Sequence, residues 1–137
     1  MNSKRLEETC LYKYLDEINK GKWTVGIELY TELERLIHDF ENPRYFYHTK
    51  EADLRMDFMQ NCVKLTKSPF YGQPMILMSW QKAFIETMYS FKMTEDQTDR
   101  FRRILLLIAR KNTKSETCSG LGLTELITGN DGSDIVC

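Results

Sequence analysis

The chain has 137 residues, of which 42% are apolar and 28% are charged. This composition can bury one hydrophobic core but not two complete domains. Nineteen Lys and Arg against twenty Asp and Glu give a net charge of −1, so no overall basic field would attract nucleic acid or an anionic membrane. The bulk numbers predict one globular domain, or part of one, in which any DNA contact comes from a local patch.

The four cysteines are far apart and form no C-x-x-C pair, which argues against a zinc site or a disulfide scaffold. Cys62 and Cys118 are expected to be small core residues. The first ten residues are charged, and no apolar run approaches the length of about 20 residues that a membrane span needs. The sequence predicts a protein of the reducing cytoplasm that has no export signal and no contact with a membrane.

Residues 1–69 show the periodicity of a helical amino-terminal section. Apolar residues at three- and four-residue spacing predict a helix over 11–18, with Gly21 as its carboxy-terminal stop. A second helix is expected over 29–40, ended by Asn42-Pro43. A third should begin after Thr49 as N-cap and continue to Leu65, before Ser68-Pro69. Its apolar face is predicted to contain Leu54, Phe58, Cys62 and Leu65.

From Phe70 the pattern changes, which suggests a second section over residues 70–137. A glycine and proline turn over 71–74 precedes a short apolar piece, Met75 to Met78. Ser79 is expected to cap a fourth helix. The residues that this helix should direct inward are Phe84, Ile85, Met88 and Phe91.

The run Ile104 to Ile108 is continuously apolar, as in a parallel strand covered on both faces. Residues 109–115 then form a connection to a helix over 116–127, and after a turn at 129–132 residues 133–137 begin another strand. We expect this piece of an α/β sheet to be truncated, because a parallel strand without neighbours cannot pair its backbone. Such a piece should associate with itself or with a neighbour.

A phosphate-binding loop requires converging backbone N–H groups, a helix N-terminus, a lysine and a hydroxyl for Mg²⁺. Lys114 and Ser115 occupy the last two places, between the expected strand and helix. The usual G-x-x-x-x-G-K-[ST] pattern is not met, because Ile108 and Thr113 stand where glycines would be. On local sequence alone, residues 112–115 could equally cap a helix on a solvated face.

The segment Ala109 to Ser115 resembles the deviant Walker A motif of phage terminase large subunits, which commonly read R-K-N-G-K-S after an apolar strand. The stretch Gly72 to Gln81 is similar to that family's G-x-P-hydrophobic segment ending in Trp-Gln. The run 32–40 and the aromatic triplet 45–47 also resemble its amino-terminal region. The similarity covers roughly residues 12–137 in the same order.

This resemblance implies the amino-terminal part of an ASCE-type P-loop ATPase, without its nuclease domain, from an ATP-driven viral DNA-packaging motor. ATP and Mg²⁺ would be its cofactors, and double-stranded viral DNA, the portal protein and the small terminase subunit its partners in the bacterial host cytoplasm. Lys114 would bind the β and γ phosphates, Ser115 would hold Mg²⁺, and Gln81 would recognise adenine. The remaining residues of the implied nucleotide site are Arg110, Lys111, Asn112 and Thr113.

Two departures from the family pattern concern the site and its surroundings. Thr113 replaces a glycine, and a β-branched residue at positive φ costs about 1–2 kcal/mol. His48 and Thr49 stand where many relatives have Phe-Asp. Trp80 and Gln81 also have structural explanations, in core packing for the first and in capping or solvating the helix for the second.

Two other function classes stay open. A non-enzymatic helical interaction module would leave Lys114 and Ser115 incidental, and another P-loop ATPase, such as a helicase, would share the loop and the glutamine. Only 22 residues follow Ser115, and none forms the apolar strand ending in Asp-Glu that positions Mg²⁺ and the attacking water. We therefore expect the full-length protein to be an ATPase and nuclease, and this piece alone to be inactive in hydrolysis.

Overall fold

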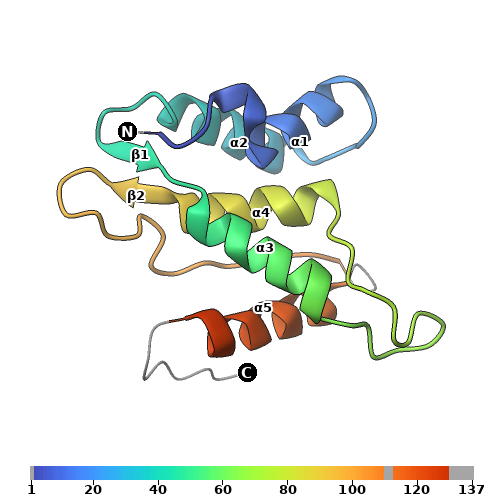
Figure 1. Ribbon diagram of the computed structural model, residues 1–137. Helices are drawn as coiled ribbons and strands as arrows, with labels where there is room; N and C mark the ends of the chain where they lie inside the picture. Colours follow the sequence, from blue (N-terminus) through green and yellow to red (C-terminus); the bar gives the residue numbers. More distant parts are fainter. Residues whose placement is uncertain (1, 110–112, 130–137) are drawn as a thin grey trace. The chain divides into compact units, whose positions relative to one another are not determined.

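A computed structural model describes residues 2–109 and 113–129. Within these ranges the chain is mainly helical, with five α-helices and one small antiparallel sheet of two strands (Figure 1). It divides into two compact units, Met1–Ala52 with Met78–Ile104 and Asp53–Leu77 with Leu105–Cys137. Each unit combines two separate segments, whereas the sequence suggested one division at residue 69.

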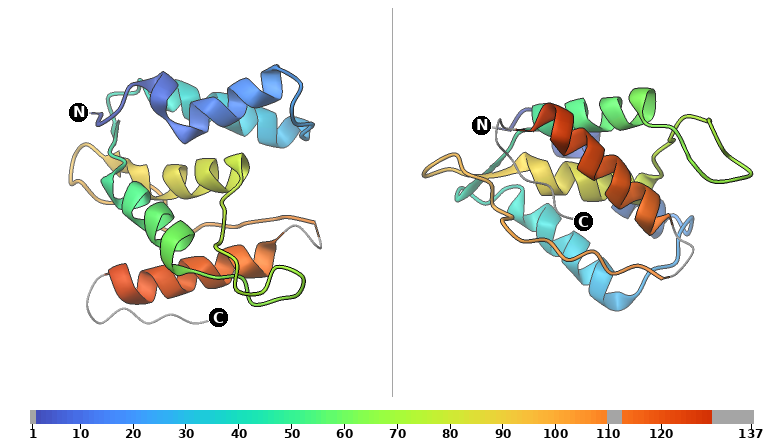
Figure 2. Two further views of the ribbon diagram at one scale, coloured as in Figure 1. Left: turned by 45° about the vertical axis from the view of Figure 1, so that its right-hand side comes forward. Right: turned by 90° about the horizontal axis from the view of Figure 1, so that it is seen from below.

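The first unit is built on α1 (Cys10–Asn19), which packs against α2 (Ile27–Asp39) and α4 (Ser79–Ser90) (Figures 1 and 2). A 3-10 turn, Leu6–Glu8, precedes α1. The Thr9 hydroxyl caps α1 by accepting the Tyr12 N–H at 3.1 Å. After α1, Gly21 has φ +77°, which confirms it as the predicted stop. The buried apolar core consists of Leu11, Tyr14, Leu15, Leu33, Leu36, Phe40, Tyr47, Ala83 and Phe91.

A small sheet that the sequence did not predict completes this unit. Strand β1 (Tyr45–Tyr47) pairs with β2 (Phe91–Met93), so that Tyr47 lies opposite Phe91. Their rings meet edge to face with centroids 4.8 Å apart, and both are fully buried. Phe91 is therefore inward-facing, as expected, but it lies on a strand and not on the fourth helix, which ends at Ser90.

Glu86 on α4 connects three parts of the first unit from a fully buried position. Its Oε1 accepts the backbone N–H of Cys10 at 2.7 Å and the hydroxyl of Tyr47 at 3.0 Å. The Lys4 ammonium lies 3.8 Å from Oε2. Because the first N–H groups of a helix lack acceptors within it, a carboxylate at the start of α1 satisfies them and favours the helix dipole.

The second unit contains α3 (Lys50–Cys62) from Asp53 onward, a hairpin-like loop over residues 63–75, and α5 (Lys114–Thr128). A Cβ placed on Gly120 of α5 would lie 3.0 Å from Met59 Cε and 3.1 Å from Met75 Sδ. This contact is possible because glycine has no side chain. Arg55 on α3 also forms an ion pair with Glu125 on α5.

The predicted extent and apolar face of the third helix are wrong. The helix ends at Cys62 and does not reach Leu65; Leu54 is 54% exposed and Cys62 is exposed, as is Cys118 on α5. Arg55, Met56 and Met59 are buried instead. The prediction failed because it assumed that the most apolar residues of the helix are the buried ones. Flexible methionines and an arginine with an ion-pair partner form the buried face of α3 instead.

The expected buried strand over 104–108 is also not found. This run has no strand assignment, and Leu105 and Leu107 are 80% and 82% exposed. An apolar run becomes a buried strand only when other strands accept its backbone, and none does so among residues 2–109 and 113–129. The expected turn at 129–132, beyond Gly129, and the expected strand over 133–137 lie outside the described residues.

Candidate functional site

The site predicted from the sequence lies at the start of α5. Thr113 immediately precedes this helix of 15 residues and has φ 57° and ψ 20°. This is the left-handed conformation, which glycine adopts without strain and a β-branched residue rarely adopts. The positive φ expected for the glycine of a phosphate-binding loop is thus present at Thr113.

Thr117 fixes this first turn from inside the helix. Its backbone N–H and its hydroxyl both donate to the carbonyl oxygen of Thr113, at 2.9 and 2.7 Å, and its side chain is fully buried. By α-helix geometry, the N–H groups of residues 114–116 have no acceptor within the helix. Three donors and the positive end of the helix dipole therefore lie at one point of the second unit.

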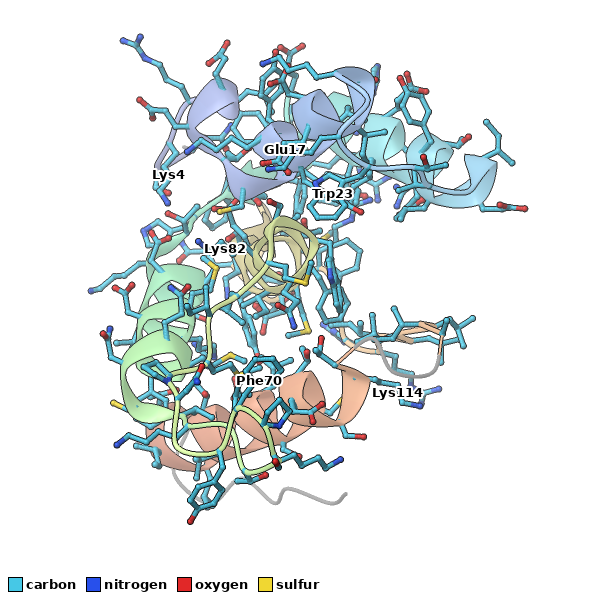
Figure 3. The ribbon with its side chains drawn as sticks, turned by 90° about the vertical axis from the view of Figure 1, so that its right-hand side faces the viewer. Lys4, Glu17, Trp23, Phe70, Lys82 and Lys114 are labelled. Atoms are coloured by element: carbon cyan, nitrogen blue, oxygen red, sulfur yellow. The ribbon has the colours of Figure 1, made fainter. Side chains whose placement is uncertain are left out.

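Lys114 and Ser115, the first two residues of α5, are both exposed. In Figure 3 Lys114 lies at the beginning of the helix. An exposed ammonium and a neighbouring hydroxyl, next to N–H groups that have no acceptor within the helix, can contact an anion and its metal ion. Arg110, Lys111 and Asn112, which the resemblance also assigns to the site, lie outside the described residues.

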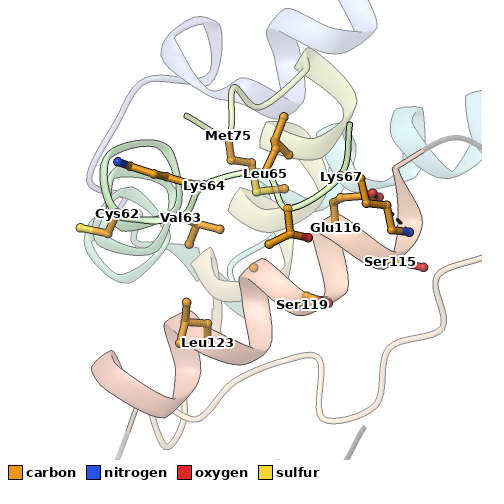
Figure 4. A pocket seen from close by; sticks show the side chains of 12 residues that line it. Cys62, Val63, Lys64, Leu65, Lys67, Met75, Ser115, Glu116, Ser119 and Leu123 are labelled. Carbon is orange, nitrogen blue, oxygen red and sulfur yellow. Dashed lines mark ion pairs between the residues drawn. The ribbon is translucent and has the colours of Figure 1, made fainter. Parts of the chain in front are cut away.

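A groove of about 240 Å³ begins at the same end of α5 and is lined along that helix from Ser115 to Leu123. Ser115 and Glu116 lie on one side of it, and Lys67 of the 63–75 loop lies on the other (Figure 4). Lys67 Nζ is 3.8 Å from Glu116 Oε1. The Glu116 carboxylate stabilises the helix dipole but repels a bound anion, and Lys67 offsets part of that repulsion.

Gln81, the expected adenine-binding residue, has a structural role. It is 2% exposed, and its Oε1 accepts the backbone N–H of Met78 at 2.7 Å. This bond caps the start of α4, as the structural alternative supposed. Trp80 is half-buried and packs against the core of the first unit. Gln81 lies in the first unit, and Lys114 and Ser115 lie in the second.

Arg100, Arg102 and Arg103 are close together in the sequence but differ in exposure. The Arg100 guanidinium donates to Asp39 Oδ2 at 2.6 Å and lies 4.0 Å from the ring centroid of Tyr45. Its side chain is 10% exposed and packs against the first unit's core, whereas Arg102 and Arg103 are exposed. Sequence reasoning missed this role and that of Glu86, because their partners are distant in the sequence. Asp39 is 61 residues from Arg100, and Cys10 is 76 residues from Glu86.

Comparison with the models of protein families, with curated proteins and with solved structures gives no match for this chain. Within the described ranges there is no group of three or more His, Cys, Asp or Glu side chains that could hold a metal ion. No helix among the described residues is long and apolar enough to cross a membrane. The chemistry of this site therefore rests on the geometry of its own residues.

Proposed function

We propose that the start of α5 binds the phosphates of Mg-ATP, and that the chain is part of the ATPase of a viral DNA-packaging motor resembling terminase large subunits. The observation that carries the proposal is the left-handed Thr113 directly before a helix that begins with Lys114 and Ser115. A loop that only capped a helix would not need this strained residue, because Ser, Thr, Asp and Asn cap helices in the extended conformation.

The residues at this point suit a magnesium triphosphate. The N–H groups of the first turn would bind phosphate oxygens, and Lys114 would neutralise the outer phosphates. The Ser115 hydroxyl would be a ligand of Mg²⁺, together with phosphate oxygens and water. The bound nucleotide would supply the energy of the motor, and the residues of this chain would bind and orient it.

Phosphate recognition is separable from the rest of the proposal and can be tested first. Calorimetric titration should show that the chain binds Mg-ATP and Mg-ADP but not adenosine, because the first turn of α5 contacts phosphates and not the base. Equal binding of adenosine, or no binding of any of the three, would contradict the assignment.

A further inference from the structure

The 63–75 loop of the second unit holds its tip in one conformation by a series of backbone hydrogen bonds. Leu65 N–H donates to Gln73 O at 2.9 Å, and Gly72 N–H donates to Leu65 O at 2.8 Å. Two turns follow at the tip, with Phe70 N–H bonded to Lys67 O and Gln73 N–H bonded to Phe70 O, both at 3.0 Å. Gly72 has φ +79°, which glycine adopts without strain.

This ordered tip exposes two adjacent aromatic side chains to solvent. Phe70 is 56% exposed and Tyr71 is 77% exposed. Exposing neighbouring aromatic rings on a hydrogen-bonded turn is unfavourable in water, and such pairs often mark a binding surface. Because the backbone is already fixed, a ligand that stacks on these rings would not have to order the loop.

The positive charge of the loop favours an anionic ligand. Between residues 63 and 78 the chain has two lysines, Lys64 and Lys67, and no aspartate or glutamate. Both lysines are exposed. The ion pair of Lys67 with Glu116 spans 3.8 Å, and 74% of its lysine side chain is exposed, so this pair contributes little and leaves the ammonium accessible. Lys67 and Phe70 are the two ends of one turn, so a basic residue and an aromatic residue belong to the same turn.

We infer that the tip of the 63–75 loop binds single-stranded nucleic acid, with a base stacked on Tyr71 or Phe70 and the phosphates contacted by Lys64 and Lys67. Unpaired bases stack on aromatic side chains regardless of their sequence. Lysines contact the phosphates that join the stacked bases. The hydroxyl of Tyr71 can donate a hydrogen bond to a phosphate. Lys67 also pairs with Glu116 in the first turn of α5, whereas Tyr71 does not line the groove beside that turn. Tyr71 therefore separates this surface from the phosphate site, and the inference does not require that ATP bind at α5.

The test measures the anisotropy of a labelled oligothymidylate of 12 nucleotides on titration with the whole chain, at several salt concentrations. Tyr71→Ala should weaken binding at least about fivefold, because one stacked base is lost. Lys64→Glu with Lys67→Glu should reduce the slope of log affinity against log salt by about 1.4, since each lost phosphate contact removes about 0.7. These side chains are exposed, so circular dichroism should show unchanged folding.

Lys20→Glu is the matched control. Lys20 in the first unit also has an exposed side chain and an ion pair with a carboxylate, that of Asp16. The Lys20→Glu chain should bind the oligonucleotide as the parent chain does. Equal affinity for duplex DNA of the same length would overturn the inference, as would an unchanged affinity of Tyr71→Ala. Binding to vesicles of phosphatidylserine without binding to the oligonucleotide would assign the loop to a membrane surface instead.

The same variants separate this inference from the proposed function. Lys114→Ala should leave the oligonucleotide affinity unchanged, and the Tyr71 variant should leave Mg-ATP binding unchanged. A chain that binds the oligonucleotide through Tyr71 but does not bind Mg-ATP would support the loop assignment and contradict only the phosphate site. The reverse result would contradict only the loop assignment.

Discussion

The carbonyl oxygen of Thr113 accepts two hydrogen bonds from Thr117, one from its backbone and one from its hydroxyl. These bonds hold the peptide that enters α5 while Thr113 itself has a positive φ. The left-handed conformation of a β-branched residue costs about 1–2 kcal/mol. The first turn of α5 is therefore both fixed and strained, which is the expected state of a preorganised anion site.

Thr113→Gly should relieve this strain. Because Thr113 has this conformation in the chain by itself, the relief should raise the free energy of unfolding by about 1–2 kcal/mol, less roughly 0.5–1 kcal/mol of backbone entropy that glycine loses on folding. Mg-ATP affinity should change by less than about twofold, since the free and the bound loop share this conformation. Urea unfolding and calorimetric titration of the two chains measure the two quantities. A Thr113→Gly chain that is clearly less stable than the parent would contradict the strain assigned to Thr113.

Glu116→Gln should also strengthen Mg-ATP binding, by roughly two- to tenfold, because a negative charge two residues from Lys114 would no longer repel the phosphates. The same substitution should lower the stability of α5 by about 0.3–1 kcal/mol, since the carboxylate favours the helix N-terminus. Calorimetric titration and urea unfolding report the two effects separately. Weaker binding would indicate that the carboxylate helps to hold the metal ion.

The helices of the first unit were predictable because their signals are local. Apolar spacing located α1 and α2, and the requirement for positive φ at Gly21 marked the end of the first helix. The pairing of Tyr45–Tyr47 with Phe91–Met93 was not predictable, because two strands of three residues have no periodicity of their own. The run over 104–108 shows the opposite case, in which a strong local signal for a buried strand has no pairing partner among the described residues.

Part of the candidate site was also predictable, because that part depends on local sequence. Lys114, Ser115 and the special backbone of Thr113 follow from a short contiguous segment. The ion pair of Lys67 with Glu116 joins residues far apart in the sequence, and no local pattern indicates it. Gln81 had two possible roles, and only the bond to Met78 showed that its oxygen caps α4.

Glu86→Ala should destabilise the first unit by about 2–5 kcal/mol. The substitution leaves the N–H of Cys10 and the hydroxyl of Tyr47 buried without their acceptor. Glu86→Gln should cost less, because its amide oxygen can still accept one of these bonds. Urea unfolding measures both, with Glu34→Ala on the exposed face of α2 as the control. Equal stability of all three variants would contradict the role assigned to Glu86.

Cys10 should react with iodoacetamide more slowly than the exposed Cys62 and Cys118 at pH 8.5. Burial, and next the charge of Glu86, raises the pKa of the Cys10 thiol from its ordinary value of 9.0 to about 12, and only the thiolate reacts. Mass spectrometry of the alkylated peptides gives the order. Cys10 labelled first in the folded chain would contradict it.

The raised pKa of Cys10 also predicts that the folded chain loses stability at high pH. The folded chain holds the thiol proton more tightly than the unfolded chain, so this contribution is fully present below about pH 9 and is lost as the pH rises toward 12. Cys10→Ser should flatten that decline in urea unfolding between pH 9 and 10.5. An equally steep decline in the variant would assign it to other groups.

The most direct test of the account is Mg-ATP titration of Lys114→Ala beside Lys13→Ala, an exposed lysine on α1 that serves as the control. Removing the Lys114 ammonium should weaken binding at least tenfold, since a charge-assisted contact to phosphate contributes about 1.5–3 kcal/mol. Lys13→Ala should bind as the parent chain does. Equal affinity of both variants and the parent would contradict the assignment of the start of α5 as a phosphate-binding site.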